Sequence, residues 1–454
     1  MSPASWRAGV APAPGDRACP GCGQVHPAAR TEVVIGAEAL DALVAWLDEH
    51  AWEHVVVVSD ANTDEAVADT LSRRLATTRR RVTRCRFPER AGLAADEEAT
   101  ETARAALRAA GPDGALVAGS GTLNDITRFA THLESLDYLS VPTAASMDGY
   151  ASSVAAMQFD GLKVSFSARA PLGIFADTRV LAAAPAEMTS WGLGDLLGKA
   201  TARFDWLLSE AVTGEPYCPV IAEAVAAPLE RCTRDPEGLL AGDEEGISTL
   251  AAGLVESGLA MAMAGSSRPA SGSEHHCSHF WDLLAHRGLR GHAPHGLQVA
   301  HATAAILRLQ LDALDRLEAG LSVPPGRRST EEDRWLGESA DSEQVEKVRR
   351  EKAELWEAYA PRWPPPPSEL ADARRRLESA SEGFPRVRSA LRALGIPPDG
   401  SDRLGLQPFE LDPETLEATL RFANRMRPRF SVLDLLESQG RLDTLARTTA
   451  EPRG

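Results

Sequence analysis

With 454 residues, the chain is longer than one hydrophobic core usually organises, and its length predicts two domains. Its formal net charge of −17 opposes attraction to nucleic-acid phosphates and anionic lipid, so we expect no nucleic-acid partner, while a locally positive pocket can still bind a small anionic substrate. Apolar runs shorter than the roughly 20 residues of a membrane span, and an N-terminus without a signal-peptide core, predict no membrane span and a cytoplasmic protein.

The first 30 residues are expected to form a flexible N-terminal segment, because residues 1–18 are rich in Ala, Pro and Gly. Cys19 and Cys22 follow in a CxxC pattern, and His26 comes shortly after them. These are three possible zinc ligands, whereas a structural zinc site needs four. A metal knuckle and a tight turn with two unligated thiols are therefore both left open.

Strand and helix patterns alternate between residues 31 and 185, which predicts an α/β domain with a Rossmann-like, doubly wound parallel sheet. Short apolar runs indicate strands at 32–35, 55–58, 81–87, 115–118 and 138–141. Longer patterned stretches indicate helices at 40–50, at 97–110 and through Asp125 to about residue 132.

Helical patterns dominate from residue 186 to the C-terminus, so the domain 186–454 is expected to be all-α. The predicted helices outside the histidine-rich stretch are 188–208, 219–231, 247–264, 384–394, 413–425 and 430–447. Residues from about 322 to 368 form a charged insertion with a helix around 342–358. Because the insertion lacks a wide apolar stripe, we expect its charges to be solvated and catalysis to lie elsewhere.

Two features of the first domain stand where open α/β sheets bind ligands, directly after a strand. Asp60 ends the strand 55–58 and could hold the ribose hydroxyls of an adenine dinucleotide, or simply form a turn. The sequence Gly-Ser-Gly-Thr at 119–122 separates a strand from a helix, so its backbone amides could approach a phosphate. A tight turn without ligand, in which Thr122 and Asp125 form a capping box, explains the same residues.

The loop at 140–153 is rich in small hydroxyl residues and follows the next strand. It offers the hydroxyls of Thr143, Ser146 and Ser152 and the carboxylate of Asp148 to a cofactor and a hydroxylated substrate. A purely structural loop would not need so many hydroxyl groups.

Seven of the eleven histidines fall between residues 270 and 301, which indicates metal binding or proton transfer. His275 and His279 are four residues apart and would share one helix face. His295 opens a second apolar run, 297–309, so two helices meeting at their ends could bring His275 and His295 together. The alternative is a polar loop with scattered histidines.

Asp195 lies among leucines in the sequence GLGDLLGK at 192–199, where a carboxylate is costly to bury unless it is paired or coordinated. With His275 and His295 it would make a three-ligand cation site with open positions for substrate. Lys199, one helical turn later, could neutralise Asp195 instead.

Together these segments resemble the sn-glycerol-1-phosphate dehydrogenase family, in the iron-containing alcohol dehydrogenase and dehydroquinate synthase-like superfamily. The resemblance covers roughly residues 17–310 and rests on the loop 119–125, SVPTAASMDGYASS at 140–153, GLGDLLGK, SGSEHHCSH at 271–279 and HGLQV at 295–299. The stretch 310–410 and the connection 288–294 are longer than the family pattern.

The resemblance implies NAD or NADP and one divalent metal (Zn, Ni or Fe), held by Asp195, His275 and His295. It places Asp148, Asp195 and His279 near the substrate as catalytic residues. The residues that it implies around the dinucleotide are Asp60, Gly119, Gly121, Thr122, Asp125, Thr143, Ser146 and Ser152.

The implied reaction is hydride transfer between the nicotinamide and dihydroxyacetone phosphate, giving sn-glycerol 1-phosphate, in an enzyme expected to be a homo-oligomer. The metal would polarise the ketone oxygen and His279 would relay the proton. Two alternatives stay open: a glycerol or polyol dehydrogenase of the same superfamily, and a catalytically inactive binding homologue. A cyclase of the dehydroquinate synthase type fits less well, because the loop after Pro142 lacks a Gly-Gly-Lys continuation.

Overall fold

A computed structural model describes residues 6–7, 18–27, 30–88, 93–159, 162–396, 405–406 and 409–451. The chain divides into two compact units, of which unit 1 comprises residues 1–196 and 235–267 and unit 2 comprises residues 197–234 and 268–454. Helix α7 (Ala186–Thr213) begins in unit 1 and ends in unit 2. The functional domains 31–185 and 186–454 stay a prediction.

Unit 1 is built on a seven-stranded sheet in the order β1-β2-β9-β6-β5-β3-β4, parallel except for the pair β1–β2. The predicted strands are confirmed, while β9 was not foreseen. Trp6–Arg7, inside the segment predicted to be flexible, pairs with β2; residues 1–5, 8–17 and 28–29 of that segment lie outside the described residues. The strands are β1 (Trp6–Arg7), β2 (Glu32–Ile35), β3 (His54–Ser59), β4 (Arg81–Arg86), β5 (Gly114–Gly119), β6 (Asp137–Pro142) and β9 (Gly173–Ala176).

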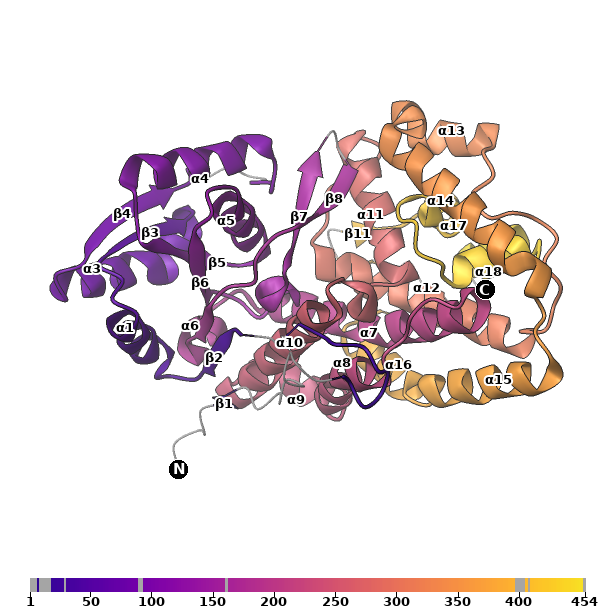
Figure 1. Cartoon of the computed structure of the whole chain (residues 1–454), viewed down its shortest axis with the longest axis horizontal. Helices are drawn as coiled ribbons and strands as arrows, with labels where there is room; N and C mark the ends of the chain where they lie inside the picture. The colour runs from indigo at the N-terminus through magenta and orange to yellow at the C-terminus, as the bar shows by residue number, and fades with distance from the viewer. Residues whose placement is uncertain are drawn as a thin grey trace. The chain divides into compact units, whose positions relative to one another are not determined.

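The sheet is buried on both faces, as a continuous valine run predicts for a central parallel strand. Successive side chains of β3 point to opposite faces, so Val55 and Val57 pack in one apolar core and Val56 and Val58 in another. Helices α1 (Ala39–Glu49) and α3 (Asp69–Thr77) cover the first face, and α4 (Glu97–Ala110) and α5 (Gly121–Leu133) cover the second (Figure 1).

The long apolar helix α10 (Glu244–Ala264) completes unit 1. Among the described residues it is the one helix with the length and composition of a membrane span, with a mean hydropathy of 1.5, and 72% of that window is buried inside the protein. Burial of this kind is typical of a core helix. The shorter elements of unit 1 are α2 (Ala61–Thr63), α6 (Thr178–Ala182), α9 (Pro236–Leu240) and the antiparallel hairpin β7 (Val154–Phe159) and β8 (Leu162–Ser167).

Unit 2 is mainly helical, as predicted, with two differences from the sequence pattern. The single helix expected at 430–447 is two helices, and a pair of two-residue strands interrupts the helical pattern. The elements are α8 (Pro219–Cys232), α11 (Ser273–His286), α12 (His295–Asp315), α13 (Thr330–Leu336), α14 (Glu343–Tyr359), α15 (Pro367–Ser381), α16 (Phe384–Ala393), β10 (Gly405–Leu406), β11 (Phe409–Glu410), α17 (Pro413–Phe422), α18 (Val432–Ser438) and α19 (Leu442–Ala450).

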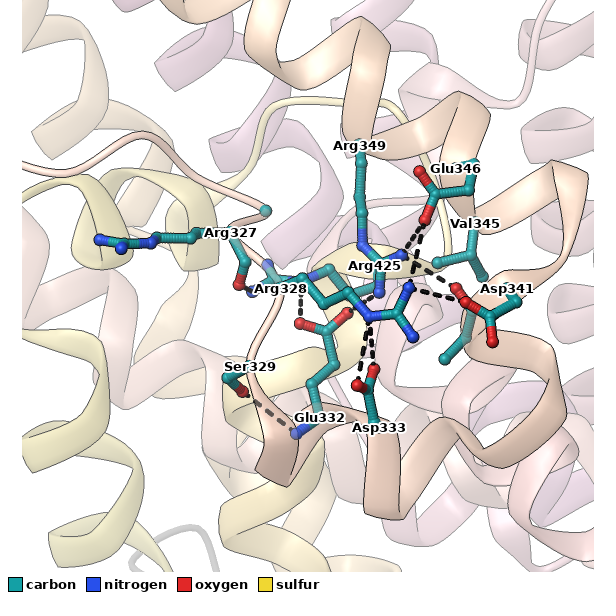
Figure 2. A network of polar contacts seen from close by, with 12 residues as sticks. Arg327, Arg328, Ser329, Glu332, Asp333, Asp341, Val345, Glu346, Arg349 and Arg425 are labelled. Atoms are coloured by element: carbon teal, nitrogen blue, oxygen red, sulfur yellow. Dashed lines mark hydrogen bonds and ion pairs between the residues drawn. The ribbon is translucent and has the colours of Figure 1, made fainter.

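The charged insertion is tied into unit 2 by buried ion pairs. Glu332 is fully buried and accepts hydrogen bonds from Arg349 and, at 3.1 Å, from Nε of Arg425, which is itself 2% exposed (Figure 2). Lys352 is likewise buried and paired with Asp434. The expectation that the charges of the insertion are solvated is therefore wrong for Glu332 and Lys352, whose partners lie far along the chain.

His301 on α12 makes folding stability depend on pH. Burial lowers its pKa from 6.5 to about 3, and the charge of Arg290 adds to the shift. Below pH 6.5 His301 binds a proton in the unfolded chain but stays neutral in the folded chain. The free energy of unfolding therefore decreases as the pH is lowered. This contribution should drop by roughly 2 kcal/mol between pH 7 and pH 5. Urea denaturation at both pH values should show that this drop is absent in His301→Leu; equal pH slopes for both proteins would contradict the assignment.

Candidate functional site

Three adjacent parallel strands of unit 1 end in predicted cofactor residues. Asp60 follows β3, Gly119 ends β5 and Thr143 follows β6, and the strand pairing puts Gly119 opposite Pro142. From β3 the chain crosses to β4 on one side, and from β5 it crosses to β6 on the other, so a topological switch point lies between β3 and β5. Open α/β sheets bind nucleotides at the carboxyl edge of such a point.

The glycine turn after β5 is held by the buried side chain of Asn124. Its Nδ2 donates to the carbonyl oxygens of Gly119 and Ser120 at 3.1 and 3.0 Å, and its Oδ1 accepts from Ser140 at 2.8 Å. Ser120 occupies the N-cap of α5 without a side-chain cap. A capping box formed by Thr122 and Asp125 is therefore wrong, and the first amides of α5 carry the positive end of the helix dipole.

Asp60 and Asp125 have structural partners in unit 1. Asp60 caps α2, since its Oδ1 accepts from Thr63 N at 2.8 Å and Thr63 Oγ1 accepts from Asp60 N at 3.0 Å. This is the turn-forming role that the sequence left open. Asp125 binds Arg128 at 2.7 Å, and burial raises the pKa of Asp125. Arg128, which the sequence did not single out, also donates to Tyr138 Oη at 2.9 Å and to the backbone of 149–154.

The loop 143–152 carries the remaining predicted residues of unit 1. The backbone N–H of Asp148 donates to Oδ2 of Asp195 at 2.9 Å, and the carboxylate of Asp148 accepts from Ser257 at 3.1 Å. Asp195 is fully buried, and Asp148 is 8% exposed. Three residues before Asp195, Gly192 touches this loop so closely that a Cβ would lie 1.9 Å from the oxygen of Ala145. Ser146 and Ser152 are buried in the same loop.

The histidine-rich stretch forms two helices of unit 2, α11 and α12. His275 on α11 and His295 at the start of α12 lie with their ring centroids 5.1 Å apart. One nitrogen of each ring falls within 4.8 Å of the other, which suits a shared cation. His286 and His292 are exposed, so a histidine in this stretch is not in itself a ligand.

A hydrogen bond on Nδ1 sets the orientation of each of the two imidazole rings, His275 and His295. His275 Nδ1 lies 2.7 Å from Oε1 of the buried Glu274, and this carboxylate can only accept, so Nδ1 carries the proton. His295 Nδ1 lies 3.1 Å from Ser278 Oγ, whose own proton goes to Gln298 Oε1 at 2.8 Å. With Nδ1 as the donor in both rings, Nε2 is the nitrogen through which each ring would bind a metal, and such a hydrogen bond on the other nitrogen orients histidine ligands in metal centres.

Two buried carboxylates, Glu274 and Asp205, bind the first turn of α11, and neither was predicted from the sequence. Glu274 accepts from Gly272 N and from Thr201 on α7, both at 2.7 Å, and burial raises its pKa. Asp205, also on α7, accepts from the backbone and hydroxyl of Ser273 at 2.8 and 2.6 Å. Burial, with the charge of Glu274, raises the pKa of Asp205 to about 6. These bonds lock the first turn of α11, where His275 lies.

Two arginines lie near the N-terminal half of α11, where His279 follows His275 by one turn. Arg427 Nη2 is 3.5 Å from His279 Nε2, and Arg429 donates to the carbonyl oxygen of Ser271 at 3.2 Å. Burial lowers the pKa of Arg427 to about 10 and that of Arg429 to about 9, so both remain cations at neutral pH. Neither arginine was foreseen, because nothing in the local pattern of 421–431 marks them.

Solved structures share the fold of the chain. A probable glycerol dehydrogenase from Sinorhizobium meliloti superposes with a TM-score of 0.58 at 17% identity, over 92% of this chain and 97% of that one. An iron-containing alcohol dehydrogenase from Thermococcus thioreducens gives a TM-score of 0.60 at 15% identity, over 93% of this chain and 98% of that one. The predicted fold, an α/β sheet domain followed by a helical region, is confirmed by this likeness.

Sequence comparisons give the family. The model for iron-containing alcohol dehydrogenases matches residues 34–185. A glycerol-1-phosphate dehydrogenase (NAD(P)+) of Bacillus velezensis is 38% identical over 276 residues, 61% of this chain and 70% of that protein. An enzyme of the same name from Geobacillus stearothermophilus is 33% identical over 423 residues, 92% of this chain and 95% of its own. The chain therefore belongs to the glycerol-1-phosphate dehydrogenase family.

Proposed function

We propose that the protein is a metal-dependent, NAD(P)-linked dehydrogenase that reduces dihydroxyacetone phosphate to sn-glycerol 1-phosphate. The observation that carries this proposal is the pair His275 and His295, whose ring centroids lie 5.1 Å apart and which each place one ring nitrogen within 4.8 Å of the other, as two ligands of one cation would be. The names of the relatives support the same activity, since they are glycerol-1-phosphate dehydrogenases acting with NAD(P)+.

Asp195 on helix α7 is our candidate for the third metal ligand. Its carboxylate is fully buried, and a buried carboxylate is costly unless it is paired or coordinated. The backbone N–H of Asp148 donates to Oδ2 of Asp195 at 2.9 Å, a contact of the kind that orients a metal ligand. One Asp and two His form a donor set that suits Zn, Ni or Fe and leaves positions open for substrate.

When bound, the metal would supply Lewis-acid stabilisation of the substrate oxygen while the nicotinamide supplies hydride. Side chains and backbone groups of the protein would orient the metal ligand and protonate the product. Asp148 fixes the carboxylate of Asp195 through its backbone N–H, and we assign the proton of the new hydroxyl to His279, an imidazole one turn from His275. The amides that begin α5 at Gly121 suit the pyrophosphate, with Asp60 and the hydroxyls of Thr143, Ser146 and Ser152 around the dinucleotide.

Arg427 and Arg429 favour a phosphorylated substrate over an unphosphorylated polyol. Their guanidinium groups lie beside His279 and the backbone of Ser271, so two cationic side chains stand next to the proposed proton donor. A planar guanidinium is suited to bidentate phosphate binding. We therefore assign these arginines to the phosphate of the substrate.

Steady-state kinetics with NADH and NADPH test the proposal. We expect dihydroxyacetone phosphate to be preferred to dihydroxyacetone, and Arg427→Gln to lower kcat/KM for the phosphate ester roughly 10- to 100-fold while leaving dihydroxyacetone unaffected. Arg386→Gln, which changes a half-exposed arginine on α16, is the matched control. A preference for dihydroxyacetone would favour the polyol dehydrogenase, and no NAD(P)H oxidation with either ketone would favour an inactive homologue. Homo-oligomerisation and a cytoplasmic location stay predictions.

A further inference from the structure

A second group of metal-binding side chains lies in residues 18–27 of unit 1. Cys19 is 3% exposed, and Cys22 and His26 are partly buried. One ligand atom from each of the three falls within 4.8 Å of the others, and Cys22 Sγ lies 3.2 Å from His26 Nε2. Ligand atoms around a tetrahedral zinc ion are separated by about 3.5–3.8 Å, so these three side chains are close enough together for shifts of a few tenths of an ångström to accommodate such an ion.

The backbone between the two cysteines forms the tight turn that a CxxC metal site uses. Cys19 N donates to the carbonyl oxygen of Gln24 at 2.7 Å, and Gly23 N donates to the carbonyl oxygen of Cys19 at 2.8 Å. Gly23 has a φ of 73°, a left-handed conformation that glycine adopts without strain. The turn folds the chain back so that a ligand atom of each cysteine comes within 4.8 Å of one from His26.

The two thiols do not form a disulfide, although they stand close together. Residues 18–27 also contain no helix or strand. The hydrogen bonds of regular secondary structure therefore do not explain why the two cysteines and His26 lie close together in this loop. A metal ion explains both observations, because it draws thiolates together and replaces a hydrogen-bonded framework.

We propose that Cys19, Cys22 and His26 bind one Zn²⁺ in a structural site separate from the proposed catalytic metal. Two thiolates and an imidazole form a soft donor set that prefers zinc to the magnesium or calcium ions that oxygen ligands select. The ion fastens the segment that precedes β2, the strand that begins at Glu32. Its role is therefore stability and not hydride transfer.

Metal analysis of the purified full chain tests the site. Wild type should hold two equivalents of metal, and Cys22→Ser and His26→Ala should each lose one equivalent, with a lower Tm and unchanged NADH turnover per remaining metal. His26→Cys supplies another zinc ligand and should restore the second equivalent. Cys85→Ser is the matched control, because burial raises the pKa of that thiol to about 11 and keeps it protonated.

Cobalt substitution of the wild-type protein gives a reading that does not depend on any variant folding. A thiolate-to-cobalt charge-transfer band is expected, and only a cysteine site can produce it, because the proposed catalytic ligands contain no sulfur. A single metal equivalent with no such band would overturn the proposal, whatever the dehydrogenase assays show. Full metal content in Cys22→Ser would also overturn it.

The same measurement can find a fourth ligand. Four other cysteines exist: Cys85 lies in β4, Cys232 in α8 and Cys277 in α11, whereas Cys218 precedes α8, outside regular secondary structure. A serine substitution that removes both the second zinc equivalent and the cobalt band identifies a thiolate that completes the tetrahedron. Retention of both in all four variants assigns the fourth position to water, with the three proposed ligands unchanged.

Discussion

Replacing His275 or His295 with alanine is expected to remove the catalytic metal and to lower kcat/KM for dihydroxyacetone phosphate by at least roughly 10³-fold, or about 4 kcal/mol of transition-state stabilisation. Each imidazole is oriented by a hydrogen bond on Nδ1, to Glu274 and Ser278 respectively, and the methyl group of alanine offers neither a ligand nitrogen nor this contact. Elemental analysis after dialysis, with NADH oxidation on the same samples, measures both losses.

Glu274→Gln should give a graded version of this effect. The variant keeps the approximate size of the side chain but removes the negative charge behind His275 Nδ1, 2.7 Å away. Changing a group that supports a metal ligand typically weakens metal binding 10- to 100-fold, so partial occupancy at low metal and recovery at high metal are expected.

His286→Ala is the control for both substitutions, because His286 ends the same helix and is exposed. It should keep the metal content and rate of wild type. Equal metal loss in His286→Ala, or full metal content in His275→Ala and His295→Ala, would remove the basis for the proposed catalytic site. Because the proposed zinc site uses other residues, each of the two ligand variants should retain one metal equivalent.

Local patterns were sufficient where a feature depends on neighbouring residues. The run Val55–Val58 specifies a strand buried on both faces, and the helix predicted at 97–110 matches α4 because its cap, apolar face and terminal glycine are close in sequence. His275 and His295 could be singled out as candidates for the same reason: seven histidines are concentrated in one stretch, with breakers between the two helices.

Features that depend on distant partners could not be read from the sequence. Asp205 reaches the N–H of Val432, 227 residues away, and Arg427 approaches His279 across 148 residues. A charged residue in a polar segment looks like solvated surface until its partner is known. Asp125 shows that a local pattern can also mislead. The sequence fitted a capping box, whereas in the structure the carboxylate of Asp125 forms an ion pair with Arg128.

Removing the carboxylate of Glu332 should have the largest effect on stability. Glu332→Ala removes one of the two carboxylates described beside the buried Arg425, leaving Glu437, whose Oε1 lies 2.9 Å from Arg425 Nη2, and it also removes the buried carboxylate that pairs with Arg349. Breaking a buried pair from one side costs about 3–5 kcal/mol, because the remaining charge keeps its desolvation penalty. A lower Tm and a lower denaturant midpoint of the variant would measure this loss.

Glu331→Ala is the control for the effect of burial, because Glu331 carries the same carboxylate as Glu332 but lies at the surface. Glu331 pairs with Arg421 at 2.6 Å, but its side chain is 48% exposed, so this substitution should cost less than about 1 kcal/mol. Glu332→Met combined with Arg425→Met would remove both buried charges together and should recover part of the stability lost in Glu332→Ala. If Glu331→Ala and Glu332→Ala lowered stability equally, the ion pairs drawn in Figure 2 would not be what fastens the charged insertion to the rest of unit 2.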